Sequence, residues 1–345
     1  MELLPLPTLQ DPLQNEIDPK SEFASEIIGK LWPGESTSDW KPDWRPFLAY
    51  YTAQCRSALV DRGENILLRK HQHVLSITNQ FKELAPRDII KEDLKELFTS
   101  KSDREKEILN NSVDLAARLY LMVNIGEVKF AVSSGTSWIW REGNLRDFIS
   151  TKFSFPQKYT GNITFQKSFN AYRLRRIAGI KFEWTNNFAD HLRMTDDKTV
   201  EIFHHASFLK HVRHQLFPEG LLEETLRTLS LLFPPHDPDT EKFFQGLETS
   251  IILDKHLTQC KQLQLEQRRI ETYTFWHDRL ILLAQAFDQS RPATLSQWWH
   301  DRRNGVQWYT FWVAIVVLFL TIFFGMVQSV EGALQVYKAY HPSRP

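Results

Sequence analysis

The side chains whose types and spacing come nearest to a reactive site are histidines in the middle of the chain. A stretch of 25 positions holds Asp190, His191, His204, His205, His211 and His214. His211 and His214 are three residues apart, so on a helix they would share a face, as two metal ligands do. No HExxH or CxxC pair accompanies them, and no third ligand has a motif-like spacing. The pattern favours half-buried or surface imidazoles near a hairpin. The alternative is a metal site built from His204, His205, His211 and His214.

Other catalytic templates are missing from the sequence. It contains no GxSxG elbow, no GxGxxG loop and no GxxxxGK[ST] loop, which removes the common hydrolase, dinucleotide and P-loop signatures. Cys55 has His71 and His73 in the same region and could act as a nucleophile, but a lone cysteine without an active-site motif is more often buried and inert. The sequence therefore leans against an enzyme, predicts no cofactor and names no catalytic residue.

Composition limits the class of protein and of partner. The chain has 345 residues, with 42 Lys and Arg against 42 Asp and Glu, so its formal net charge is zero. Its 42% hydrophobic and 24% charged residues are ordinary globular values, which excludes wholesale disorder. A neutral chain has no general attraction to nucleic acid, and no nucleic-acid partner is expected. Two cysteines are too few for a disulfide framework, which favours an intracellular body.

One segment has the composition of a membrane span. Residues 308–327, WYTFWVAIVVLFLTIFFGMV, contain no charged side chain, and twenty helical residues cover roughly 30 Å, the thickness of a hydrocarbon core. A buried core helix is the alternative, but such helices seldom stay apolar on every face. The lipid bilayer is therefore the first expected partner. The residues taken to form the anchor are Trp308, Trp312, Phe319, Phe323, Gly325 and Val327.

The ends of the chain suggest how it would be inserted. Residues 1–20 have neither a basic leader nor an unbroken apolar stretch, as a cleavable signal peptide would. About 18 residues follow the apolar run, so the layout is that of a tail-anchored, single-pass protein with its body in the cytosol. The sequons at Asn110 and Asn162 should then stay unmodified. Val330, Leu334 and Tyr337 share a helical stripe, which predicts that the helix continues past the bilayer.

The periodicity predicts a mainly α fold with a small β hairpin element and one C-terminal transmembrane helix. Helix, strand and hairpin in the middle of this α+β chain have the order of a winged-helix module. The expected divisions are a disordered lead over 1–20, a helical region over 21–125, a mixed α+β region over 126–235, a helical region with a juxtamembrane helix over 236–303, a transmembrane helix over 308–327 and a short tail over 328–345.

Individual elements follow from apolar spacing and turn residues. The N-terminal helices are expected over 21–32, 43–61, 64–83, 87–99 and 103–124. The expected hairpins pair 128–132 with 138–140, and 193–194 with 200–203, and a strand is expected over 180–185. Later helices are expected over 165–177, ended by Gly179, and over 220–233, 239–258, 270–287 and 295–303.

Several long strings resemble a large family of uncharacterised fungal proteins with a C-terminal single transmembrane anchor. The strings are LAARLYLM (115–122), WREGNLRDFI (140–149), RRIAGIKFEWTNNFADHLRM (175–194), IFHHASFL (202–209), EETLRTLSLLFP (223–234), QWWHDRRNGVQWYTFWVA (297–314) and FFGMVQSVEGALQVYKAY (323–340). The resemblance covers roughly residues 110–345. It implies a cytosolic helical body on a C-terminal anchor and supplies no catalytic residue.

These observations leave more than one class of function open. The preferred hypothesis is a membrane-anchored cytosolic interaction or scaffold protein with a protein partner, either alone or as a homo-oligomer. One alternative is a membrane-bound, metal-dependent enzyme that uses the histidine-rich hairpin. Another is an oligomeric pore distantly related to CorA-type channels, because Gly325-Met326 ends the apolar run. That family requires Gly-Met-Asn and a second span, whereas Val327 and Gln328 follow here.

Overall fold

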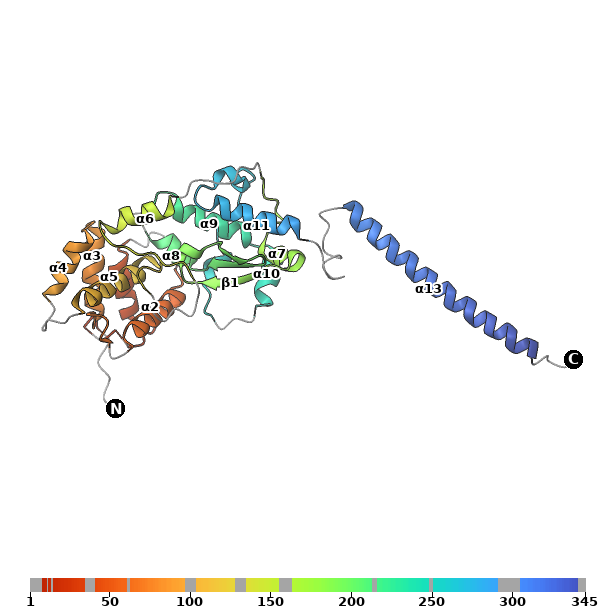
Figure 1. The fold of residues 1–345 in the computed structure, drawn as a ribbon, viewed down its shortest axis with the longest axis horizontal. Coiled ribbons are helices and arrows are strands. Elements are labelled where there is room, and N and C mark those ends of the chain that lie inside the picture. Colours follow the sequence, from red (N-terminus) through yellow and green to blue (C-terminus); the bar gives the residue numbers. More distant parts are fainter. Residues whose placement is uncertain are drawn as a thin grey trace. The chain divides into compact units, whose positions relative to one another are not determined.

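The fold is seen in a computed structural model (Figure 1). It describes residues 8–10, 12–13, 15–34, 41–60, 63–96, 104–127, 135–154, 163–212, 216–247, 251–290 and 305–340. The chain divides into two compact units, one made of Met1–Arg175 and Gly179–Gln289, and the other of Arg176–Ala178 and Ser290–Pro345. We call the first unit the body. The predicted class is confirmed, because the described chain is mainly helical with a small three-stranded sheet and one apolar C-terminal helix.

Helix α5 is the centre of the N-terminal half of the body. The helices there are α1 (Glu22–Leu31), α2 (Arg45–Ala58), α3 (His71–Lys82), α4 (Arg87–Lys95) and α5 (Glu105–Leu121). Helices α2, α3 and α4 all pack on α5, and every α5 residue from Ser112 to Leu121 is buried. Each predicted N-terminal helix is present, although α3 begins later than expected because 63–70 run as turn and extended chain up to Lys70.

The predicted disordered lead is wrong for the part of it that the structure describes. Leu9, Leu13 and Ile17 are buried in the body. The Leu13 N–H donates to the Arg69 carbonyl at 3.0 Å, and the Gln72 N–H donates to the Leu9 carbonyl at 2.9 Å. Apolar side chains four residues apart thus cover the start of α3. Prolines prevent this lead from forming a helix, but they do not prevent it from packing.

The body contains one small three-stranded sheet among its described residues. It consists of β1 (Lys181–Thr185), β2 (Met194–Asp196) and β3 (Thr199–Phe203), in the order β1-β3-β2. The pairing of β2 with β3 is antiparallel, as the second predicted hairpin requires, and the Lys198 N–H donates to the Asp196 carboxylate in the turn at 2.7 Å. β1 pairs with β3 in parallel, and every residue of β3 is buried.

The first predicted hairpin is not formed by its described residues. Residues 128–134 lie outside the described chain, and Trp138 makes a single parallel bridge with Ile125 instead of belonging to a strand. The segment is pinned by backbone bonds between Trp138 and the chain at Asn124 and Gly126, each 2.9 Å long. It therefore runs beside the end of α5 and does not fold back on a neighbouring strand.

The second half of the body is helical around the sheet (Figure 1). Its α-helices are α6 (Leu145–Phe153), α7 (Ala171–Ala178, of which the last three residues are assigned to the other unit), α8 (Ala206–His211), α9 (Leu221–Leu232), α10 (Pro238–Gln245) and α11 (His277–Gln289). Short 3-10 turns are η2 (Phe188–Asp190), η3 (Lys255–Thr258), η4 (Glu266–Arg268) and η5 (Ile270–Thr272). Helix α7 ends at Gly179, whose φ of 70° is the left-handed conformation expected of a glycine cap.

Three helices in this half are shorter than predicted because caps begin or end them. The Asn170 side chain accepts the Arg173 N–H at 2.9 Å, so α7 begins at Ala171 and not near 165. Helix α10 ends before Gly246, so the prediction of a continuous helix over 239–258 is wrong. The helix predicted over 270–287 has only a 3-10 turn at its start, and α11 begins at His277.

The C-terminal unit contains the long helix α13 (Gly305–Tyr340). Trp308–Tyr340 is long and apolar enough to cross a membrane, and none of its most apolar 18-residue stretch is buried. Its 36 residues extend over about 54 Å, so the prediction that the helix continues past residue 327 is confirmed. The juxtamembrane helix predicted over 295–303 and residues 341–345 of the predicted tail lie outside the described chain.

Candidate functional site

The histidines at the end of β3 lie in the interior of the body. His204 and His205 are both 1% exposed, and their rings stack with centroids 4.1 Å apart. The His205 Nε2 atom lies 2.6 Å from the Asn186 Oδ1 atom, whereas neither ring nitrogen of His204 has a hydrogen-bond partner among the described residues. Burial lowers the pKa of His204 to about 3, so its ring is neutral at physiological pH.

The other members of the histidine set are separated from this pair. His211 ends α8 and lies edge-on to the Trp44 ring at 5.0 Å, and His214 lies outside the described chain. His191 is bonded to the hydroxyl of Thr228 at 2.6 Å. Among the described residues, no three His, Cys, Asp or Glu side chains are grouped so that they could hold a metal ion. The described imidazoles instead pack against aromatic rings and neighbouring polar groups.

Cys55 lacks the setting of a nucleophile. It is fully buried on α2, and burial raises the pKa of its thiol well above the usual range, which keeps it protonated. His71 is bonded to the Tyr51 hydroxyl at 3.0 Å. His73 is half-buried on α3, where burial lowers its pKa. A neutral, enclosed thiol corresponds to the inert role that the sequence favoured.

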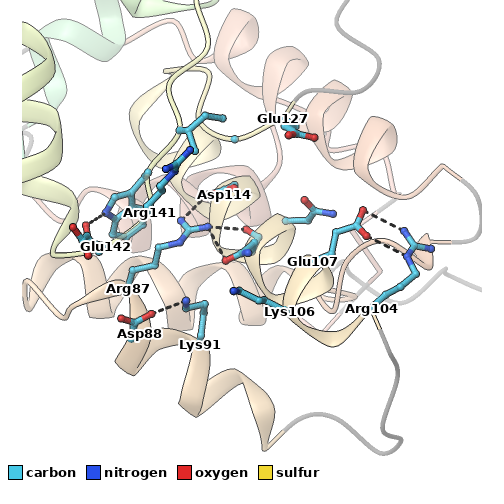
Figure 2. Close-up of a pocket in the computed structure, with 15 residues that line it drawn as sticks. Arg87, Asp88, Lys91, Arg104, Lys106, Glu107, Asp114, Glu127, Arg141 and Glu142 are labelled. Carbon is cyan, nitrogen blue, oxygen red and sulfur yellow. Dashed lines mark hydrogen bonds and ion pairs between the residues drawn. The ribbon is translucent and has the colours of Figure 1, made fainter.

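A polar pocket of about 780 Å³ lies beside α4 and α5 (Figure 2). Helix α5 supplies side chains at four-residue intervals along one face, and the chain around 126–127 and 139–142 closes the opposite wall. Fifteen residues line it, and ten are charged: Arg87, Asp88, Lys91, Arg104, Lys106, Glu107, Asp114, Glu127, Arg141 and Glu142. A volume of this size is typical of small-molecule sites, although the lining is far more polar than usual.

The floor of the pocket is a fixed, buried ion pair. The Arg87 guanidinium, whose side chain is 2% exposed, donates to the Asp114 carboxylate at 2.6 Å and to the Asn110 side-chain oxygen at 3.2 Å. Its flat face lies over the Trp140 ring, 4.7 Å from the centroid. Burial raises the pKa of Asp114, and the guanidinium opposes that rise. These three contacts therefore hold Arg87 in one position.

Backbone geometry at Gly126 allows this floor to close. Its φ is 82°, and a Cβ atom there would collide with the Asp114 carboxyl group. Arg118, one helical turn after Asp114 on α5, donates to the Ile125 carbonyl at 2.7 Å and so also holds this turn. A glycine is thus required both by the conformation and by the close approach of the carboxylate.

The chain matches no family model, no curated protein and no solved structure.

The pocket was not found from the sequence. Its parts come from segments 87–91, 104–114, 126–127 and 139–142, and only the packing of α4 on α5 brings them together. One signal was present: Asp114 and Arg118 interrupt the apolar face of α5 at a four-residue spacing. Charged residues on a buried helical face need partners, so they mark a polar network that the fold must complete.

The anchor residues named from the sequence all lie on α13. Phe319 and Phe323 are 67% and 47% exposed, and Val327 is 38% exposed. The rings of Trp308 and Trp312 lie 6.2 Å apart at the start of the helix. Aromatic rings at one end of an exposed apolar helix are the arrangement expected at a membrane interface. Apart from its chain neighbours and the nearby backbone of α13, no described atom lies within 4 Å of the position of a Cβ on Gly325.

Proposed function

We propose that this protein is a single-pass, membrane-anchored interaction or scaffold protein whose body lies in the cytosol. The observation that carries the proposal is helix α13, whose apolar side chains have no protein cover along the stretch that could span a bilayer. A helix that is apolar on every face and exposed in the folded chain is stable only in an apolar medium. The resemblance to fungal proteins with a C-terminal anchor belongs to the same proposal.

Two features of the body support the cytosolic orientation. Cys55 and Cys260 are unpaired and buried, which suits a reducing compartment. Asn110, in the sequon Asn110-Asn111-Ser112, lies within α5, and its side-chain oxygen accepts a bond from Arg87. In a lumenal body a glycan on Asn110 would prevent that contact and open the pocket floor. A glycan on Asn110 would therefore damage the body, and its two free thiols suit a reducing compartment.

The choice of an interaction role over an enzyme rests on the histidines. His204 and His205 are enclosed, His191 is bonded to Thr228, and the described His211 packs on Trp44. None of these imidazoles is combined with a nucleophile and an open cavity, as general acid–base chemistry requires. A pore formed by several copies of α13 would require polar side chains along the whole span, whereas residues 308–327 offer only apolar and aromatic groups and Thr310 and Thr321.

The orientation is tested by glycan mapping on the full chain in microsomes. We expect Asn162 and Asn110 to remain unmodified, and a sequon added on an extended tail after α13 to gain a glycan. An endoglycosidase-sensitive shift that disappears in Asn162→Gln would place the body in the lumen and contradict the proposal. Protease added outside the microsomes supplies an independent readout, because it should digest the body and leave a small protected fragment containing α13.

The scaffold role is tested by exchanging the anchor. Residues 305–340 are replaced by a Leu/Ala helix of the same length, and body-specific partners are captured by cross-linking in intact membranes. An anchor that serves only as a tether can be exchanged without loss of partners. Loss of every partner together with retained membrane binding would show that α13 itself carries the specific contact.

The alternative of a metal-dependent enzyme is tested by metal analysis. Stoichiometric zinc or iron in the purified chain, lost in His204→Ala with His205→Ala, would favour the enzyme.

A further inference from the structure

The charges that line the α4–α5 pocket are balanced in number but not in their arrangement. Five are basic and five acidic. Arg104 and Glu107 form a pair of their own at 3.2 Å, and Arg104 is held further by Asn65 at 2.6 Å. Figure 2 shows this pair at one side of the pocket, with Glu127 and Glu142 on opposite sides of the central group. The centre of the pocket therefore has its own local charge.

We call the six remaining charged residues the central group: the cations Arg87, Lys91, Lys106 and Arg141 and the acids Asp88 and Asp114 (Figure 2). By formal charge this group has an excess of two positive charges, whereas the whole lining, with Arg104, Glu107, Glu127 and Glu142, is neutral. Both acids are already engaged: Asp114 binds Arg87 at 2.6 Å, and Asp88 binds Lys91 at 2.6 Å. The hydrogen bond from Lys91 lowers the pKa of Asp88, so this acid is charged at neutral pH.

Lys106 and Arg141 are the two cations of the centre that have no hydrogen bond or ion pair within the described chain. Both are exposed, one on α5 and the other on the facing segment that follows Trp140. Lys106 is one turn before Asn110, and Asn110 is one turn before Asp114, so all three follow the pocket face of α5. Two exposed cations thus line a pocket whose floor holds Arg87 in one position.

We propose that this pocket binds the phosphate monoester group of a ligand, held between Lys106 and Arg141 above the Arg87–Asp114 floor. A phosphate monoester carries about −1.5 to −2 charges at pH 7, which matches the local excess. Its three terminal oxygens accept bonds from Arg and Lys donors, and Asn110 and Asn111 supply amide groups beside them. A soluble phosphorylated compound and a lipid headgroup share this chemistry.

The two flanking carboxylates set a limit on the ligand. Glu127 and Glu142 are exposed and make no ion pair within the described chain. Extra negative charge on a ligand would approach these groups, so polyphosphates are disfavoured relative to a single phosphate monoester. The pocket therefore predicts opposite effects for two kinds of substitution. Removing its mobile cations weakens phosphate binding, and removing its flanking acids strengthens it.

The test uses the purified full chain in neutral detergent, so it does not depend on membrane orientation. Thermal unfolding is followed with inorganic phosphate, with dihexanoyl phosphatidic acid, and with dihexanoyl phosphatidylglycerol, whose phosphate is a diester, all at matched ionic strength. We expect phosphatidic acid to raise the midpoint by a few degrees near saturation, and phosphatidylglycerol to have little effect. An equal effect of inorganic phosphate indicates a soluble ligand, and an effect of phosphatidic acid alone indicates a lipid headgroup.

Matched variants connect the shift to these side chains. Lys106→Gln with Arg141→Gln should weaken the affinity for phosphatidic acid at least about tenfold, and Glu127→Gln with Glu142→Gln should increase it. Lys167→Gln with Lys261→Gln removes two exposed lysines that are not in the lining and should change nothing. All six positions are exposed, so the variants should fold. No phosphate-dependent shift in the unmodified chain, or an equal shift in the Lys106/Arg141 variant, would overturn the proposal.

Discussion

The body and helix α13 differ in which side chains they bury and which they leave exposed. The body buries charged side chains such as Arg87, Asp114 and Glu224, and it gives each of them partners. Helix α13 instead leaves Val, Leu and Phe side chains exposed over its whole apolar stretch. The comparison shows two ways of fixing a structure. The body depends on internal contacts that single substitutions can remove, whereas α13 depends on the medium around it.

The largest expected effect comes from removing the region that requires an apolar medium. Deletion of 305–345 should transfer the protein completely from the membrane fraction to the soluble fraction, because Trp308–Tyr340 is the one candidate span among the described residues. Sedimentation after a carbonate wash measures this. A chain without 305–345 that still sediments with membranes would show that the body binds lipid by itself.

The next effect tests the core of the body. Leu280 on α11 is fully buried, so Leu280→Ala should lower the free energy of unfolding by about 2–5 kcal/mol through lost contacts and a cavity. Its neighbour Leu282 is 39% exposed and provides the control, with an expected change below about 0.5 kcal/mol for Leu282→Ala. Urea denaturation followed by tryptophan fluorescence measures both. Similar costs at the two positions would mean that α11 packs through a different face.

A third effect depends on pH and concerns His204. Its pKa is about 3 in the folded body and about 6.5 in the unfolded chain. Above pH 6.5 the ring is neutral in both states, and below it the unfolded chain takes up a proton that the folded chain does not. Stability should therefore fall by about 2 kcal/mol between pH 7 and pH 5 from this residue.

The pH effect is isolated by comparing two stability profiles. His204→Phe keeps an aromatic ring and removes the titration, so its stability should decline less steeply with acid than that of the unmodified chain. Burial also lowers the pKa values of His191 and His205, so these residues contribute to the dependence of the unfolding free energy on pH in both proteins. Parallel profiles between pH 7 and pH 5 would show that water reaches the His204 ring.

The smallest effect concerns the cap of α11. The Glu224 carboxylate accepts the N–H groups of Thr274, Phe275 and Trp276 at 2.7–2.8 Å. Glu224→Gln keeps the shape but removes the charge and one acceptor, and it should cost about 1 kcal/mol. Glu223→Gln changes an exposed neighbour on the same helix and should cost less. If the two variants were equally stable, the carboxylate would not be holding the start of α11.

The same cap explains where sequence reasoning succeeds and where it stops. Periodicity found α9 nearly to the residue and placed Tyr273 and Trp276 in the core, which is confirmed. It could not place the start of α11, because the group that caps it lies on α9, about 50 residues earlier. Local pattern identifies which side chains turn inward, whereas the end of a helix can depend on a distant partner.

Pairing between distant segments was equally hidden. The hairpin of β2 and β3 has a polar turn and was predicted, but nothing in the residues of β1 indicates a parallel partner 18 positions away. The candidate site shows the same limit. Adjacent His204 and His205 stay together, while the Arg87–Asp114 floor needs the packing of α4 on α5. Closeness in the sequence therefore predicts that the two histidines lie together, but it does not predict the pocket, whose residues come from distant segments.

Both cysteines of this protein are buried, so its surface offers no thiol group to thiol reagents. Cys55 and Cys260 are unpaired and almost fully enclosed, and burial raises the pKa of the Cys260 thiol to about 11. Maleimides and oxidants act on exposed thiolates, so neither residue should react in the folded chain. A cysteine introduced on α13 or at the pocket rim would be the sole accessible site for a spin label or a fluorophore. The native chain can thus carry distance probes without first losing its own cysteines.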